Sequence, residues 1–174
     1  MKGKFIAAGT IVGAIFLFMW GGALHSGVPM DVQGLYEFQD GAAVTQAVKA
    51  NGQRGNGIYF TKEGLWASVG FRPDMSDKTQ DLAPYFVVEI ITDLAVAFLL
   101  SLLILAIKCS GMMERAGVLA MVAVAAGFEN QVSDWNWYGF SARFSVFEFI
   151  DIVGAWFVLG LILSTLKNKL APSA

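Results

Sequence analysis

Four long apolar stretches, separated by polar segments, dominate the pattern of the 174-residue chain. A helix needs about 20 residues to cross the roughly 30 Å hydrocarbon core of a bilayer, and each stretch approaches or reaches that length. The pattern therefore predicts an all-α membrane protein, a bundle of four transmembrane helices. The predicted spans are residues 1–23, 85–107, 116–132 and 146–166.

The first apolar stretch has two interpretations. Its basic start at Lys2 and Lys4 and its small residues near Gly21 to Ala23 are typical of a secretory signal peptide. Its apolar run, however, is long for the central region of such a peptide. We expect this stretch to be a retained helix.

Lysine and arginine near the ends of the spans predict the orientation, because cytoplasmic loops carry an excess of these residues. In the short loops of the opposite side only Arg143 occurs. We therefore expect a multi-pass protein of a bacterial-type inner membrane, with both termini in the cytoplasm. The basic residues on the predicted cytoplasmic side are Lys2, Lys4, Lys108, Arg115, Lys167 and Lys169.

Residues 24–84 are too many for a plain connector between the first two spans. Asp40 to Ala50 reads as a short helix, with Asp40 as its N-cap and Asn51-Gly52 as its stop. Gly57 to Thr61 and Leu65 to Phe71 read as a β-hairpin. The sequence thus predicts a small α+β extracytoplasmic cap, a helix plus a β-hairpin. Because so small a unit is marginal alone, it should lie on the bundle or on a partner.

Composition narrows the function. Hydrophobic residues make up 56% of the chain and charged residues only 15%, a deficit of charge that indicates lipid surroundings. The net charge of -2 gives no indication of a nucleic-acid partner, and since no Lys/Arg-rich run exists to contact a phosphate backbone, we expect none. A lone cysteine, Cys109, excludes an intrachain disulfide and paired-thiol chemistry. The chain has no Gly-rich phosphate loop, HExxH, CxxC or Gly-x-Ser-x-Gly motif, which favours a protein that is not an enzyme.

Acidic residues inside the predicted spans need an explanation, because charge at membrane depth is costly and tends to mark functional sites. At 1.5 Å per residue from the nearest basic helix end, Asp93, Glu129 and Asp151 all rise roughly 21 to 24 Å. Glu89 precedes Asp93 by four residues and Glu148 precedes Asp151 by three, so each pair shares a helix face. The sequence predicts a ring of carboxylates at one level.

Two interpretations of this ring stay open. The acids could form a structural polar network at headgroup level, bonded to the cap or to Asn130 and Gln131. Alternatively, they form a metal, proton or small-ligand site, offset by His25, Arg54, Arg72, Arg143 or a bound ion. Oxygen ligands alone favour Ca²⁺ or Mg²⁺, and His25 would admit a transition metal. No cofactor is evident from motifs; a divalent cation or a lipid is the ligand to test for.

Aromatic and small residues mark contact surfaces. Trp135, Trp137 and Tyr138, together with Trp20, are predicted interface anchors at headgroup level, or alternatively a docking platform. Gly9 and Gly13 form a GxxxG motif, which lets helices approach closely. Similar small-residue pairs on the third stretch are Ala116, Ala120, Ala123 and Gly127.

Three short motifs carry a resemblance: Trp20 followed by His25, the run Asn56 to Phe60, and Trp135 to Tyr138 before the last span. With these motifs the chain resembles a family of small uncharacterised bacterial four-helix inner-membrane proteins. The resemblance implies the topology and carries no activity. The outline is also similar to claudin-type proteins, but only Gly64-Leu65-Trp66 matches and the paired cysteines are missing, so that assignment is rejected.

The function expected from the sequence is a non-catalytic accessory or structural subunit of a larger membrane complex. Its partners would be the lipid bilayer and other membrane subunits, or a second copy of the chain. The alternative is an outer-facing cation, proton or small-ligand site formed by carboxylates of the second, third and fourth helices.

Overall fold

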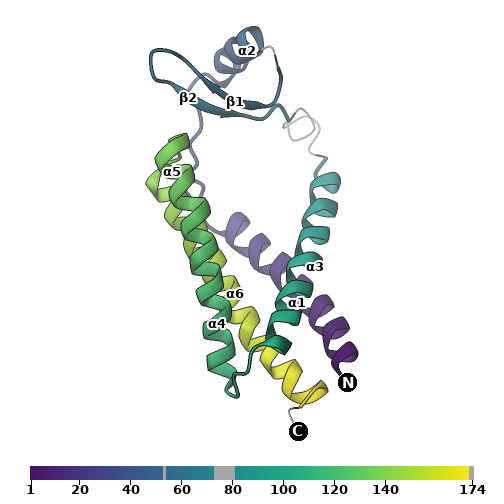
Figure 1. Ribbon diagram of the computed structural model, residues 1–174. Helices are drawn as coiled ribbons and strands as arrows, with labels where there is room; N and C mark the ends of the chain where they lie inside the picture. Colours follow the sequence, from purple (N-terminus) through teal and green to yellow (C-terminus); the bar gives the residue numbers. More distant parts are fainter. Residues whose placement is uncertain (53, 73–80, 173–174) are drawn as a thin grey trace.

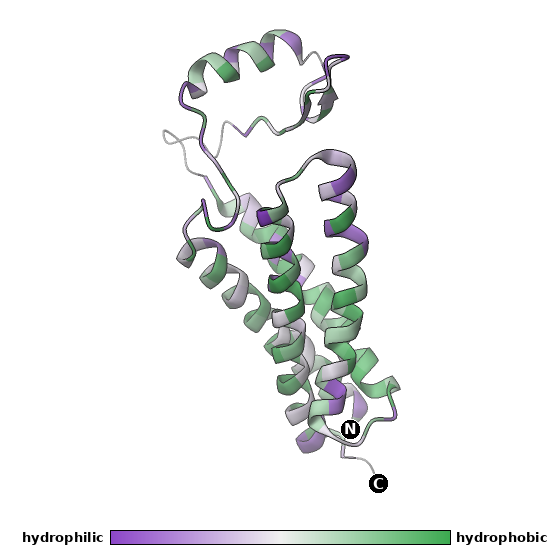
Figure 2. Ribbon diagram, turned by 90° about the vertical axis from the view of Figure 1, so that its left-hand side faces the viewer, coloured by the Kyte–Doolittle hydropathy of each residue, from purple (hydrophilic) through white to green (hydrophobic). Residues whose placement is uncertain are grey.

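A computed structural model describes residues 1–52, 54–72 and 81–172 of the chain. It is mostly helical, and its long helices are α1 (Lys2–Gly27), α3 (Ala83–Ala106), α4 (Met112–Gly127) and α6 (Ala142–Leu170) (Figure 1). The helix of α4 continues through a π-helical turn, η2 (Phe128–Val132), into α5 (Ser133–Tyr138). Four helical stretches of the described residues are long and apolar enough to span a membrane, which confirms that part of the prediction. Figure 2 shows apolar residues along much of their length.

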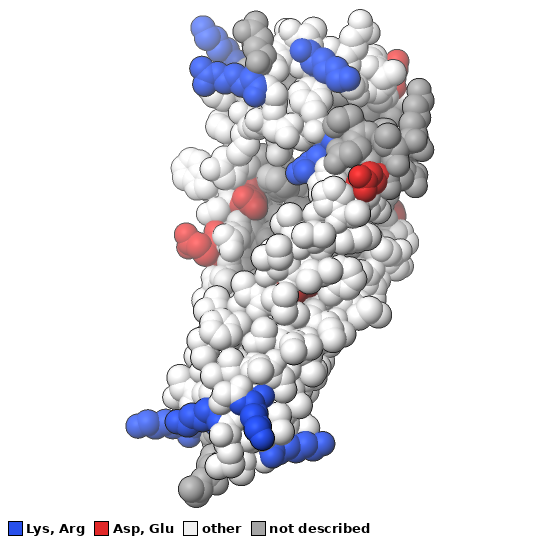
Figure 3. All heavy atoms as spheres, turned by 90° about the vertical axis from the view of Figure 1, so that its right-hand side faces the viewer, with Lys and Arg blue, Asp and Glu red and all other residues white. Residues whose placement is uncertain are grey.

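Both chain ends lie at the same end of the long helices, and the segment between α1 and α3 lies beyond the opposite end (Figure 1). On the face seen in Figure 3, lysine and arginine side chains gather near the two ends of the molecule, acidic side chains lie just below the upper basic group, and a mostly uncharged surface separates these acids from the lower basic group. This distribution is what a multi-pass membrane protein requires, because its middle band contacts hydrocarbon.

Small residues set how closely the long helices pack. α1 lies along α3 and α6, and α4 lies along α6. A Cβ atom added at Gly9 would meet Ser101 Oγ at 2.5 Å, and one added at Gly13 would meet Ala97 Cβ at 2.8 Å. The GxxxG motif therefore serves contacts within the chain, between α1 and α3.

The buried core lies near the end of the helices that carries the termini. Phe5, Ile104, Leu119, Leu159 and Leu163 are fully buried there. A buried guanidinium group connects the segments at this end. Arg115 donates hydrogen bonds to the carbonyl oxygens of residues 109 and 110 and to the side-chain oxygen of Asn168. The hydrogen bonds satisfy the charged group and tie the α3–α4 turn to the end of α6.

The segment between α1 and α3 contains α2 (Gly41–Asn51) and the strands β1 (Gly57–Phe60) and β2 (Trp66–Val69). The Asp40 side chain accepts a hydrogen bond from the N–H of residue 43 at 2.8 Å, which confirms it as the N-cap of α2. The two strands pair antiparallel, with Gly57 opposite Val69 and Phe60 opposite Trp66, as the predicted hairpin requires. Residues 53 and 73–80 of the predicted cap lie outside the described residues.

Two features of the helices differ from the expectation. α1 extends to Gly27, so His25 lies in its last helical turn rather than beyond it. The third stretch continues past Val132 to Tyr138 through η2 and α5. Because of both extensions, polar residues lie on helices, and the helix backbone fixes the direction in which their side chains project.

Candidate metal centre

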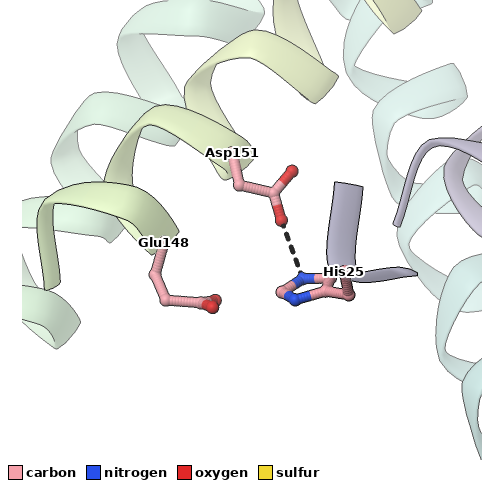
Figure 4. Close-up of side chains that lie close together, drawn as sticks. All are labelled: His25, Glu148 and Asp151. Carbon is pink, nitrogen blue, oxygen red and sulfur yellow. Dashed lines mark hydrogen bonds and ion pairs between the residues drawn. The ribbon is translucent and has the colours of Figure 1, made fainter. Parts of the chain in front are cut away.

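Three side chains from α1 and α6 converge at the end of the helices far from the termini. One ligand atom each of His25, Glu148 and Asp151 lies within 4.8 Å of the other two. Figure 4 shows both carboxylates projecting from α6 toward the imidazole ring at the end of α1. An imidazole and two carboxylates at this spacing are a ligand set that a metal ion can use.

Local helix geometry explains the convergence. Glu148 and Asp151 are three residues apart on α6, so their side chains share one helix face. α1 packs against α6, and His25 in its last turn meets that face. The ring of Phe147 contacts the imidazole edge-on, with 5.6 Å between ring centroids. The site is thus built on two helices and needs little from flexible loops.

Both oxygens of Asp151 have a partner on α1. Trp20 Nε1 donates to Asp151 Oδ1 at 2.6 Å, and His25 Nε2 lies 3.2 Å from Asp151 Oδ2. The Asp151 side chain is 16% exposed and that of His25 44% exposed. The carboxylate is therefore held inside the protein while the imidazole remains open to the surroundings.

Gln33 fixes the orientation of the imidazole. The residue is only 2% exposed, and its Nε2 donates to the carbonyl oxygens of Val28 at 2.6 Å and His25 at 3.1 Å. These two bonds turn its Oε1 toward His25 Nδ1, at 3.3 Å. Because an amide oxygen only accepts, Nδ1 must carry the proton in this bond. Nε2 then has a lone pair for a metal ion, or a second proton in an ion pair with Asp151.

The turn that carries Gln33 is docked on the start of α6. Arg143 Nη1 donates to the carbonyl oxygen of Asp31 at 3.0 Å, and Ser141 Oγ donates to that of Gly34 at 3.4 Å. Gly34 has a φ of 81°, and a Cβ atom there would lie 2.6 Å from the Phe144 backbone nitrogen. Only glycine fits this position, so Gly34 allows the turn to pack directly against the start of α6, beside the site.

The other predicted acids lie outside this cluster. Asp93 is buried on α3, and its Oδ2 has no hydrogen-bond partner among the described residues. Glu89, one helical turn before it, is exposed, as is Glu129 on η2. Of the six predicted site residues, the structure brings together His25, Glu148 and Asp151. Two predicted offsetting cations are engaged elsewhere: Arg143 on the docked turn, and Arg72 over the ring of Tyr85.

Two further residues complete the site. The sequence assigned Trp20 to the lipid interface, whereas the structure gives its indole N–H to Asp151. Gln33 was not predicted, since a glutamine in a turn-rich segment carries no distinguishing signal.

The remaining predicted anchors are Trp135, Trp137 and Tyr138. They are exposed on α5, and Tyr138 contacts Trp66 of β2 edge-on.

Comparison with known proteins adds no relative from which a role could be transferred. No protein-family model, curated protein or solved structure matches the chain. The function is therefore inferred from the chain's own residues.

Proposed function

We propose that this protein binds a divalent transition-metal ion at the outer face of a bacterial-type inner membrane, through His25, Glu148 and Asp151. In this proposal the four long helices form a transmembrane bundle with both termini in the cytoplasm. Residues 24–84 form the extracytoplasmic cap. The orientation rests on the excess of lysine and arginine at the end that carries the termini, following the positive-inside rule.

The observation that carries the proposal is the 4.8 Å spacing of the three ligand atoms. Ligand atoms bound about 2.1 Å from a tetrahedral ion lie roughly 3.5 Å apart, so the cluster must close by only about 1 Å around a metal. Side-chain rotation supplies such a movement without displacing α1 or α6. His25 and Asp151 are already in contact at 3.2 Å.

The ligand types favour a transition metal over Ca²⁺ or Mg²⁺. The hard cations prefer oxygen ligands alone, whereas an imidazole suits zinc, iron, nickel or copper. Three protein ligands leave one coordination position for water or another molecule, as in catalytic zinc sites. The site is therefore suited to hold an ion that remains accessible from outside.

The surroundings of the ligands support the same function. Gln33 accepts from Nδ1 of His25 and leaves Nε2 to face the carboxylates. Trp20 holds the second oxygen of Asp151. Metal-binding histidines and carboxylates commonly have such hydrogen-bond partners, which fix the tautomer and the direction of the ligand.

The test is a calorimetric titration of the chelator-stripped full-length protein in mild detergent with Zn²⁺ and Mn²⁺. His25→Ala and Asp151→Asn should each weaken binding of the preferred ion by about 100-fold or more, since the first removes a ligand and the second replaces a charged carboxylate ligand by a neutral amide. Glu89→Gln and Glu129→Gln are matched controls, because these acids lie outside the cluster and should leave the affinity unchanged. Equal affinities in all four variants would refute the metal site.

A second function, an accessory subunit of a larger membrane complex, is favoured by a different observation. Large aromatic side chains are exposed on the segment between α1 and α3, outside the long helices: Tyr36, Phe38, Phe60 and Trp66. Phe60 and Trp66 stack with 5.3 Å between ring centroids. Exposed aromatic groups of this kind are enriched at protein interfaces. The partner would be another membrane subunit or a second copy of the chain.

Purification from native membranes in mild detergent tests this second function. The chain should elute as part of a larger assembly, and Phe60→Ser with Trp66→Ser should release it from that assembly. A solitary monomer in every mild detergent would contradict it. The metal titration is independent of this result, because neither aromatic residue touches the metal centre.

A further inference from the structure

Three helix ends surround a pocket at the end of the molecule that carries the termini. Its volume is about 400 Å³, and it lies between the start of α1, the end of α3 and the end of α6. Lys2 and Lys167 are its charged lining residues, and Leu105 and Ile107 add apolar surface. The metal centre lies at the opposite end of α1 and α6, so the two sites are separate.

Lys167 is buried without a counter-ion. The residue is only 8% exposed, and its ammonium group has no hydrogen bond or ion pair with any residue that the structure describes. Its Nζ is not among the fully enclosed polar atoms that lack a partner, so the ammonium group of this pocket-lining residue stays accessible. A buried charge without a partner is costly. An anion bound in the pocket supplies the missing partner.

The surroundings of Lys167 add positive charge. Arg115 is only 3% exposed, and its partners are neutral: two backbone carbonyl oxygens and Asn168, the residue after Lys167. Among the described residues at this end of the molecule the one acid is Glu114, which accepts from the N–H of residue 111 at the start of α4. On the face seen in Figure 3, basic side chains gather at this end without acidic ones. Two buried cations thus lie close together without a carboxylate to balance them.

We propose that this pocket binds the headgroup of an anionic phospholipid, with the phosphate between Lys167 and Lys2. A lysine ammonium group carries three hydrogen-bond donors and binds phosphate as a point charge. The apolar side chains of Leu105 and Ile107 contact the glycerol backbone and the start of the acyl chains. The proposal depends on the membrane placement of the long helices and not on the metal centre.

The position of the pocket favours a lipid over a free phosphate ion. α1, α3 and α6 are each long and apolar enough to span a membrane, and the pocket lies where they end, at the level expected for headgroups. Basic pockets between membrane helices are typical binding places for lipid phosphate groups. Sites for small ligands range from about 300 to 1,000 Å³, so this pocket accommodates a phosphate with its glycerol.

The test is native mass spectrometry of the delipidated full-length protein in mild detergent. The protein is titrated with phosphatidylglycerol and with phosphatidylcholine of the same acyl chains, whose choline group neutralises the phosphate. One molecule of phosphatidylglycerol should bind about tenfold more tightly than phosphatidylcholine, the ratio expected for one hydrogen bond between charged groups. Equal affinity for the two lipids would overturn the proposal.

A third titration separates the two sources of phosphate. Inorganic phosphate, added at the same concentration as the lipid, should leave bound phosphatidylglycerol in place, because it has no glycerol or acyl chain to contact Leu105 and Ile107. Displacement of the lipid would indicate a site for free phosphate and would overturn the lipid assignment.

Variants identify the residues responsible. Lys167→Gln should weaken phosphatidylglycerol binding about tenfold and leave phosphatidylcholine binding unchanged, because it removes the buried charge. Lys169→Gln is the matched control, since Lys169 lies in the same last turn of α6 but is exposed and does not line the pocket. Lys2→Gln, at an exposed position, should weaken binding about fivefold and provides a second variant if Lys167→Gln does not fold.

Unchanged phosphatidylglycerol binding in Lys167→Gln and Lys2→Gln would overturn the proposal. An equal loss in Lys169→Gln would overturn it as well, because it would show attraction to the basic end as a whole and not to the pocket. The metal titration keeps the two sites apart: all three substitutions should leave metal affinity unchanged.

Discussion

Replacing Trp20 by phenylalanine should weaken metal binding by about 10- to 100-fold. The indole Nε1 donates to Asp151 Oδ1 at 2.6 Å, and phenylalanine keeps an aromatic ring while removing that donor. A hydrogen bond to a charged group contributes about 1.5–3 kcal/mol. A 10- to 100-fold change in affinity corresponds to about 1.4–2.8 kcal/mol, so the two magnitudes agree. The Asp151 side chain is 16% exposed, and solvent replaces the lost donor only in part.

The assay is a competition titration in which a chelator of known affinity and the purified protein share a limiting amount of Zn²⁺. Trp137→Phe is the matched control, because Trp137 is 71% exposed and lies away from the cluster. Thermal unfolding of both variants separates loss of the fold from loss of the hydrogen bond. If Trp20→Phe and Trp137→Phe bind Zn²⁺ equally well, Trp20 does not orient a metal ligand and this reasoning is refuted.

Three further outcomes follow from the structure. With the free metal ion at 100 times its dissociation constant, removing the metal should lower the free energy of unfolding of the wild-type protein by about 2.7 kcal/mol, roughly 5–11 °C in Tm. The Tm of Asp151→Asn, measured in the same thermal melt, should not change when the metal is removed. Gly160→Ala should destabilise by about 1–3 kcal/mol, because its Cβ would lie 2.7 Å from the α4 backbone, whereas Gly117→Ala meets nothing within 4 Å and should be neutral by the same melt. Gly34→Ala should weaken metal binding about tenfold, while Gly64→Ala, with φ also positive but no neighbour, should not.

The fold could be predicted where its causes are local in the sequence. Apolar length alone indicates four helices that can span a membrane, and four are found among the described residues. Asp40 caps α2 as expected, because a carboxylate that precedes a helix accepts from its free N–H groups. The hairpin turn contains Gly64 with φ of 94°, a conformation that glycine adopts freely. The π-helical turn η2 has no such local signal in the sequence.

The site could be predicted only in part, because counting residues gives depth along a helix and not direction around it. Asp93, Glu129 and Asp151 were expected at one level, yet a common level does not make side chains meet. Asp151 and Glu148 face α1, whereas Glu129 is exposed on η2. The direction of each side chain follows from which helices pack together, and that was not readable from one sequence. Gln33 joins the site through a turn docked over α6, a long-range contact without any local pattern.

The metal centre and the glycines of the helix contacts are parts of one arrangement. A Cβ atom at Gly154 would lie 3.2 Å from Trp20 Cζ2, so the missing side chain gives the indole room beside α6. From there its N–H reaches Asp151, three residues back on the same helix. Nearer the N-terminus of α1, Gly9 and Gly13 let this helix pack closely against α3 and α6. This packing fixes the direction of α1, and with it the positions of Trp20 and His25 beside the carboxylates. Close packing in the apolar part of the molecule thus determines the geometry of the polar site at its end.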